Sequence, residues 1–413
     1  MMKKNREINR FAKLWYAESS TYNFSVNISI GLVNAFMVKI LGYGVLDLGY
    51  LIAIRIIAIA LSQLPAIFLL AYKRNMRKQV WFICGAINRI GWALVPLALL
   101  LPRSQSLIYL AALSFTAQFA GGIGGVAAMD VIGSNIPSME APIYFSTMNK
   151  LSYASIALSQ LTGILLFLYP INLTLKYLLL YILAFLTALI STMILFKIPD
   201  NRLEGANSTS LTLRPVETLI SDPNLRKYLY IITLFNFAVN IPAPFWDYIV
   251  LNLAGGRDII IPVKNMVNLL VKFFTVNWWQ SLIHRKGLKR VLVEGMAFTS
   301  LVPLFYFEAN SVFTVFFAEA FSGFIWAPVE IGTSIYSVYL PPEYIRPLYL
   351  TAVNFITNTV SAIAATVGTT ISAATGNVYS ALITSTALRA IIAGITYRVL
   401  PEVNGVQGSA TKH

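Results

Sequence analysis

The sequence predicts an all-α integral membrane protein. Its twelve transmembrane helices are expected to form two six-helix bundles, related by a pseudo-two-fold axis along the membrane normal. Three observations predict this class: an apolar composition, a series of apolar runs of membrane length, and an internal repeat. Hydrophobic residues make up 57% of the 413 residues and charged residues 12%, which is about half the charged share of a soluble domain. Most of the surface must therefore face lipid.

Apolar runs of about 20 residues are long enough to cross a bilayer as helices. Six such runs precede the longest polar interval and six follow it. They span residues 23–41, 48–71, 80–101, 107–133, 150–170, 175–196, 228–251, 259–282, 291–308, 311–336, 347–371 and 378–399. We therefore expect a first bundle at 1–197, a cytoplasmic linker at 198–225 and a second bundle at 226–413.

The basic residues define the expected orientation. The formal net charge is +14, but Lys and Arg cluster by loop: of the 31, 22 fall on one side, 4 on the other and 5 within spans. Since cytoplasmic loops carry the excess of Lys and Arg, both termini should lie in the cytoplasm of a multi-pass protein of the cell membrane. The basic loops lack interleaved aromatics, so nucleic acid is not an expected partner.

Cysteine and histidine are too scarce for a disulfide framework or for a metal site built from them. Cys84 is the single cysteine, and the two histidines are His284 and His413. We expect no metal and no cofactor.

The halves repeat one another at a slowly drifting offset. Asn23-Phe24-Ser25-Val26-Asn27 recurs from Asn236 to Asn240 at offset 213, and Leu94-Val95-Pro96-Leu97 recurs from Leu301 to Leu304 at offset 207. Arg74 matches Arg285 at 211, and the run from Pro142 to Asn149 matches that from Pro347 to Asn354 at 205. Two parallel six-span repeats are typical of one large class of transporters.

On these residues the chain resembles the major facilitator superfamily, from about Asn23 to Leu400. Between its second and third spans that family shows Gly-x-x-x-Asp-Arg-x-Gly-Arg-Lys, with an acidic partner in the fourth span. This chain has Lys73 at the position of the family's Asp, and His284 at the equivalent position of the second half. Met76 replaces the second Gly. The resemblance implies a gating role for Arg74, Arg77, Lys78, Asp130, Arg285 and Lys289.

Polar residues in the first and seventh spans predict a solute-binding cavity. Pro242 and Pro244 break the seventh span and free carbonyl groups. In the family these spans line the cavity. The expected substrate-binding residues are Asn27, Asn34, Arg55, Asn236, Asn240, Trp246, Asp247 and Lys272. The alternative is that the amides bind neighbouring helices and the prolines only kink.

Charged residues in the eighth and tenth spans predict ion pairs. Lys264, Asn268 and Lys272 are four residues apart, which is a step of about 40° around a helix, so they share one face of the eighth span. Glu319 and Glu330 are eleven residues apart and differ by about 20°, so they share one face of the tenth span. Opposite charges at bilayer depth should find each other, so Lys272 should pair with Glu319 or Glu330. The two glutamates are candidates for proton coupling, with Glu330 preferred as the one nearer the cytoplasm; a static ion pair is the alternative.

Three arginines lie within spans. Arg55, about 12 Å deep, is expected to bind an anion or to bridge the bundles towards Asp247. Arg55 and Arg89 have no acidic partner in the first half except Asp47 and Asp130, near opposite membrane faces. Arg89 lies in a span that the family places peripherally and is expected to be structural. The same is expected of Arg389, with Glu294 as its partner.

The function expected is secondary transport of a small organic solute by alternating access, coupled to protons. Partners would be the solute, protons and lipid, with a monomer as the default. Phe245, Trp246, Tyr248 and Trp326 favour export, because aromatic and amide-rich linings suit amphipathic solutes. The alternatives are a polytopic membrane enzyme, which would need a catalytic constellation that no loop contains, and a sensor or scaffold that has lost transport.

Overall fold

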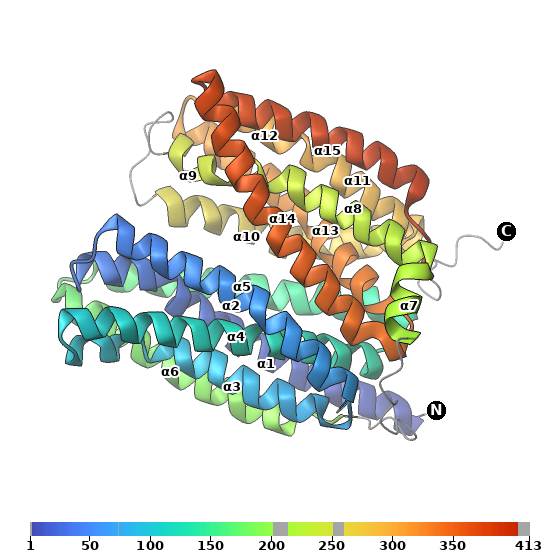
Figure 1. Ribbon diagram of the computed structural model, residues 1–413, viewed down its shortest axis with the longest axis horizontal. Coiled ribbons are helices and arrows are strands. Elements are labelled where there is room, and N and C mark those ends of the chain that lie inside the picture. Colours follow the sequence, from blue (N-terminus) through green and yellow to red (C-terminus); the bar gives the residue numbers. More distant parts are fainter. Residues whose placement is uncertain (1, 73, 201–213, 251–259, 404–413) are drawn as a thin grey trace. The chain divides into compact units, whose positions relative to one another are not determined.

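The computed structural model of the protein describes residues 2–72, 74–200, 214–250 and 260–403. Every regular element in these ranges is a helix, and Figure 1 labels the α-helices. Up to the middle of the chain they are α1 (Met2–Lys39), α2 (Val45–Tyr72), η1 (Arg74–Met76), α3 (Arg77–Ala93), η2 (Val95–Leu100), α4 (Arg103–Asn135), η3 (Ser138–Glu140), α5 (Ala141–Leu168) and α6 (Leu173–Lys197).

The second half begins with the short helix α7. Its elements are α7 (Arg214–Ser221), α8 (Pro223–Asn240), η4 (Ala243–Phe245), α9 (Trp246–Tyr248), α10 (Ile260–Lys286), α11 (Leu288–Thr299), α12 (Leu301–Phe307), α13 (Val312–Tyr339), η6 (Glu343–Ile345), α14 (Arg346–Thr375) and α15 (Tyr379–Val399). Asp222 caps α8 by accepting from the backbone N–H groups of Asn224 and Leu225 at 2.7 and 3.3 Å, as expected of an Asp before a helix.

Nine helical segments of the described residues are long and apolar enough to cross a membrane. The helix α1, the broken segment of α3 with η2, and α10 coincide with the other three predicted spans. Twelve crossings therefore follow the predicted order, six before α7 and six after it.

Two predicted spans are interrupted at matching points of the repeat. The helix α3 ends at Ala93 and is followed by η2, while a break at Ser300 separates α11 from α12. Pro96 and Pro303 lie in these segments, at equivalent places of the repeated Leu-Val-Pro-Leu sequence. Proline lacks the N–H that continues a helix, so the same sequence produces the same irregularity twice.

The chain divides into two compact units. Unit 1 comprises Met1–Ile136 and Ala154–Thr212, and unit 2 comprises Pro137–Tyr153 and Leu213–His413. The helix α5 contributes to both, since its residues up to Tyr153 group with unit 2.

Unit 1 is built by close packing of α2 and α3 on α4. A Cβ on Gly122 would lie 2.0 Å from Ser62 Oγ, and one on Gly121 would lie 2.5 Å from Asn88 Nδ2. The glycine run of α4 thus lets neighbouring helices approach closely, as small residues do in membrane bundles.

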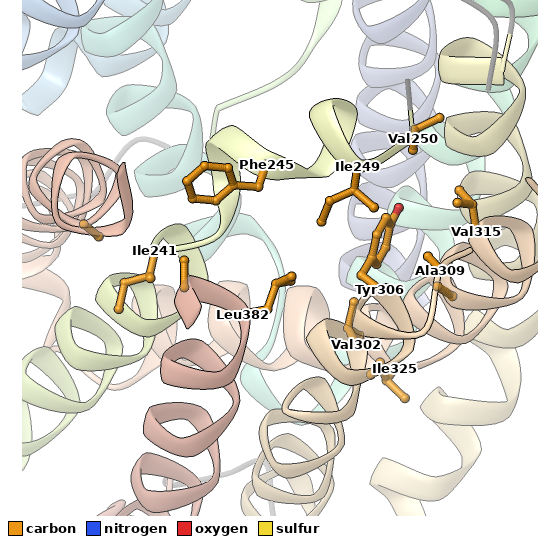
Figure 2. Close-up of a cluster of buried hydrophobic side chains, with 13 residues drawn as sticks. Ile241, Phe245, Ile249, Val250, Val302, Tyr306, Ala309, Val315, Ile325 and Leu382 are labelled. Carbon is orange, nitrogen blue, oxygen red and sulfur yellow. The ribbon is translucent and has the colours of Figure 1, made fainter. Parts of the chain in front are cut away.

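Unit 2 contains an apolar cluster at the broken end of the seventh span. Figure 2 shows Ile241, Phe245 and Ile249 from this segment, with Tyr306 and Leu382 from α12 and α15. The cluster packs the segment after α8 against the rest of unit 2. Its member Tyr306 also donates a hydrogen bond to Glu319 of α13.

Candidate functional site

The candidate site lies along the contact between α10 and α13 in unit 2. The two helices cross where a Cβ on Gly323 would lie 2.4 Å from the backbone oxygen of Asn268. This crossing needs glycine, because a larger residue would push the helices apart. It places two groups of charged side chains on either side, which we call the Glu319 cluster and the Glu330 cluster.

The Glu319 cluster consists of Asp247, Lys264, Asn268, Tyr306 and Glu319. Lys264 Nζ lies 3.0 Å from Asp247 Oδ1 and 3.5 Å from Glu319 Oε1. Asn268 Nδ2 donates to Glu319 Oε2 at 2.9 Å, and the Tyr306 hydroxyl donates to Glu319 Oε1. Glu319 is 9% exposed, whereas the Asp247 side chain is 62% exposed.

Two carboxylates and one ammonium make up the ionisable charges of the Glu319 cluster. With all three ionised, the cluster carries one negative charge in excess. Asp247 is exposed, so the buried Glu319 is the carboxylate for which an uncompensated charge is costly, and the cluster has the composition of a site that takes up one positive charge there.

The Glu330 cluster consists of Tyr153, Lys272 and Glu330. Lys272 Nζ lies 2.6 Å from Glu330 Oε1, the Tyr153 hydroxyl donates to Glu330 Oε2, and the ammonium lies over the Tyr153 ring, 5.4 Å from its centre. Its charges balance. Of the two partners predicted for Lys272, the structure places it against Glu330, while Lys264 takes Glu319. Tyr153 had no signal in the sequence, because a tyrosine in an apolar span is unremarkable.

Three of the four predicted asparagines of the first and seventh spans donate to their own helices, and the fourth, Asn34, accepts from Arg55 Nη2 at 3.5 Å. Asn27 Nδ2 donates to the Asn23 oxygen, Asn236 Nδ2 to the Ile232 oxygen, and Asn240 Nδ2 to the Asn236 oxygen, each at 2.8 Å. Asn240 also donates to Ser361 Oγ at 3.0 Å. Each NH2 group thus commits one N–H to local structure. Trp246 packs against Tyr306 with ring centres 4.7 Å apart, and so adjoins the Glu319 cluster.

Arg77 organises the predicted gating residues of unit 1. Its guanidinium lies 3.2 Å from Asp130 Oδ2 and 2.8 Å from Asp200 Oδ1, and Nη1 donates to Ser134 Oγ at 2.8 Å. Arg77 is 1% exposed and Asp130 is fully buried. The sequence predicted the Asp130 partner but missed Asp200, which follows α6 in what was interpreted as linker.

The other predicted gating residues whose side chains the structure describes are at least partly exposed. Lys78 is half-buried and Arg285 is exposed. Lys289 Nζ lies 4.0 Å from Glu402 Oε1. The side chain of Arg74 lies outside the described residues.

Comparison with solved structures identifies the fold of the chain. No family model and no curated protein sequence matches the chain. Among solved structures, the proton:xylose symporter XylE of the major facilitator superfamily (MFS), bound to 6-bromo-6-deoxy-D-glucose, superposes on 98% of this chain and 98% of its own, with a TM-score of 0.73 and 12% identity. This chain has the MFS fold.

Other MFS structures agree. The transporter FucP in its outward conformation covers 94% of this chain and 99% of its own at a TM-score of 0.73 and 13% identity. The human organic anion transporter MFSD10 covers 95% and 99% at 0.72 and 12%. The all-α architecture predicted from the sequence is confirmed, and so is the resemblance at the level of fold.

Two expectations for intramembrane arginines are wrong. Arg89 has an acidic partner, since its Nη1 lies 3.0 Å from Glu18 Oε1 and 2.6 Å from Ser191 Oγ. The prediction failed because Glu18 was assigned to a cytoplasmic tail, whereas α1 already begins at Met2.

The second error concerns Arg389, which does not pair with Glu294. Its guanidinium donates to the backbone oxygens of Thr299 and Val239 at 2.8 and 3.2 Å. Glu294 instead pairs with Arg290 at 3.0 Å, because the two residues are four apart on α11 and hence neighbours on its surface.

Proposed function

We propose that the protein is a secondary active transporter, and not an enzyme, which moves a small organic solute across the cytoplasmic membrane by alternating access and couples this movement to protons. The fold supports the proposal, because solved proteins with this fold are described as a proton:xylose symporter, a fucose:proton symporter and an organic anion transporter. The observation that carries the coupling is the excess carboxylate of the Glu319 cluster.

Glu319 is the proposed proton carrier. A proton on its carboxylate balances the charge of the cluster and leaves Lys264 paired with Asp247, 3.0 Å away. Loss of that proton draws Lys264 towards Glu319, 3.5 Å away. Since Asp247 lies just after the broken end of α8 and Glu319 lies on α13, the position of Lys264 links protonation to the geometry of two helices. The charge balance thus favours Glu319 over Glu330, and Glu330 is proposed to hold α13 in place through Lys272 and Tyr153.

The proposal predicts different results for two matched variants in proteoliposomes loaded with a pH-sensitive dye. Solutes that stabilise the purified protein in a thermal-shift screen are added outside, and internal pH is followed. Glu319→Gln should abolish solute-driven proton flux yet keep solute exchange, because the substitution imitates the protonated state. Glu330→Gln should keep solute-driven proton flux per folded molecule, but it should lower the yield of folded protein, because Lys272 loses its partner.

Wild-type proton flux in both variants would contradict coupling through α13. The absence of solute-driven proton flux in the wild type, with solute exchange intact, would contradict proton coupling altogether.

We further propose export as the direction. Trp246 adjoins the Glu319 cluster, Tyr248 is 47% exposed and Trp326 packs against Phe235 with ring centres 6.0 Å apart. Such aromatic surfaces bind amphipathic solutes. Comparison of flux in right-side-out and inverted vesicles, using the same dye, tests the direction.

A further inference from the structure

Arg55 differs from the other two intramembrane arginines in what its guanidinium binds. Arg89 has the Glu18 carboxylate at 3.0 Å, and Arg389 has two backbone oxygens at 2.8 and 3.2 Å. Arg55 has one long hydrogen bond, from Nη2 to Asn34 Oδ1 at 3.5 Å. In the part of the chain that the structure describes, no carboxylate pairs with it. Its positive charge is therefore uncompensated.

Further donors surround this charge. Arg55 Nε is buried without an acceptor among the described residues, and so is Nε1 of Trp92. The guanidinium carbon lies over the Trp92 ring, 5.0 Å from its centre. Trp92 is fully buried in the apolar core of unit 1 with Val33, Phe36 and Leu51. The Arg55 side chain is thus held against a rigid indole, while N–H groups of both residues are unused.

The surroundings argue that a ligand meets the open side of the Arg55 guanidinium, opposite the buried Trp92 ring. Asn34 lies on the same face of α1 as Asn23 and Asn27, because positions 4 and 11 residues along a helix differ by about 40° and 20°. Arg55 is half-exposed and Asn34 exposed. A guanidinium does not face hydrocarbon without a partner, so the open side of Arg55 must meet water or an anion. Its planar fork matches a carboxylate in two parallel hydrogen bonds.

We propose that Arg55, with Asn34 and Trp92, forms the anion subsite of the transported solute, and that the solute is an organic carboxylate with an apolar body. This inference rests on the proposed transport function and names its substrate class. The guanidinium binds the carboxylate, and exposed apolar surface beside it favours a hydrophobic body over a small inorganic anion: Ile52, three residues before Arg55 on α2 and hence its neighbour on the helix surface, is 43% exposed.

The test is binding of matched probes to the purified protein: benzoate against its neutral analogue benzamide, and hexanoate against hexanamide. The carboxylates should raise the melting temperature and bind at least tenfold more tightly than the amides. Arg55→Gln should remove this preference, and Arg55→Lys should retain part of it. Arg103→Gln removes an exposed positive charge of the same unit and should leave the preference unchanged.

Asn34→Asp provides a gain-of-function check that does not depend on tolerance of a lost arginine. It places a carboxylate beside the Arg55 guanidinium, so the ligand-free variant should melt higher than the wild type and lose its response to benzoate.

Equal binding of benzoate and benzamide, no binding of either carboxylate, or an unchanged preference in Arg55→Gln would overturn the proposal. Carboxylate binding that depends on Arg55, without any transport in proteoliposomes, would instead contradict the transport function and leave the subsite standing. Proton-coupled transport of neutral solutes alone, unaffected by Arg55→Gln, would contradict the subsite and leave the function standing.

Discussion

At the scale of single residues, the contribution of each buried charge to stability depends on its nearest opposite charge. Arg77 is the strongest case, since two carboxylates bind one guanidinium at 3.2 and 2.8 Å. Removing one partner of a buried pair strands the other in a medium of low polarity. This usually costs about 3 to 5 kcal/mol.

We therefore predict that Asp130→Asn and Arg77→Ala each lower the free energy of unfolding by about 3 kcal/mol or more. Asp200→Asn should also destabilise the protein, because the Asp200 side chain is only 9% exposed and accepts two hydrogen bonds from Arg77, at 3.3 and 2.8 Å. The double variant Asp130→Asn/Arg77→Ala should lose much less than the sum of the single losses.

Thermal unfolding of the purified variants measures these effects, and transport rates of the same variants test the gating role expected for Arg77 and Asp130. Strictly additive losses of stability would show that Arg77 and Asp130 act independently.

At the scale of elements, α13 is a continuous helix that contains a proline. Pro328 has no N–H for the backbone oxygen of Phe324, four residues earlier. Trp279 of α10 supplies the missing donor, since its Nε1 donates to this oxygen at 2.6 Å. An interhelical hydrogen bond thus replaces one within the helix. It joins α10 to α13 at Phe324, which lies between Glu319 and Glu330 on α13.

This exchange predicts a rescue. Trp279→Phe leaves the Phe324 oxygen unsatisfied and should destabilise the protein by about 1 to 3 kcal/mol. Pro328→Ala restores the N–H, so the double variant should be more stable than Trp279→Phe alone. Trp278→Phe is the control, because Trp278 is 52% exposed. Melting temperatures decide the matter; a double variant less stable than both single variants would contradict the exchange.

At the scale of the whole molecule, the twelve crossings and the basic loops predict that both termini lie in the cytoplasm. In a Cys84→Ser background, cysteines at Gln105 and Asn310, in loops predicted to lie outside, should react with an impermeant maleimide in intact cells. A cysteine at Met139, which is 71% exposed and lies in a predicted cytoplasmic loop, should react only after lysis. Labelling of the cysteine at position 139 in intact cells would show that the predicted orientation is reversed.

The candidate site shows where prediction from the sequence stopped. Spacing on a helix placed Lys264, Lys272, Glu319 and Glu330 on faces that meet, because helical geometry is local and regular. It did not decide which lysine meets which glutamate, and it missed Glu18 and Asp200 because both had been placed outside the spans. A helix boundary moved by a few residues is enough to hide a partner.

The sequence by itself determined the class of the protein, the number and order of its crossings and its two-fold repeat. Hydrophobic length, basic loops and recurring prolines are properties of short segments, so they can be read before any packing is known. Only the tertiary structure decided the partners of the buried charges: Asp247 and Glu319 for Lys264, Glu330 for Lys272, Glu18 for Arg89, and no carboxylate among the described residues for Arg55. Such choices depend on which helix faces pack together and at what depth, and these relations join residues far apart in the chain.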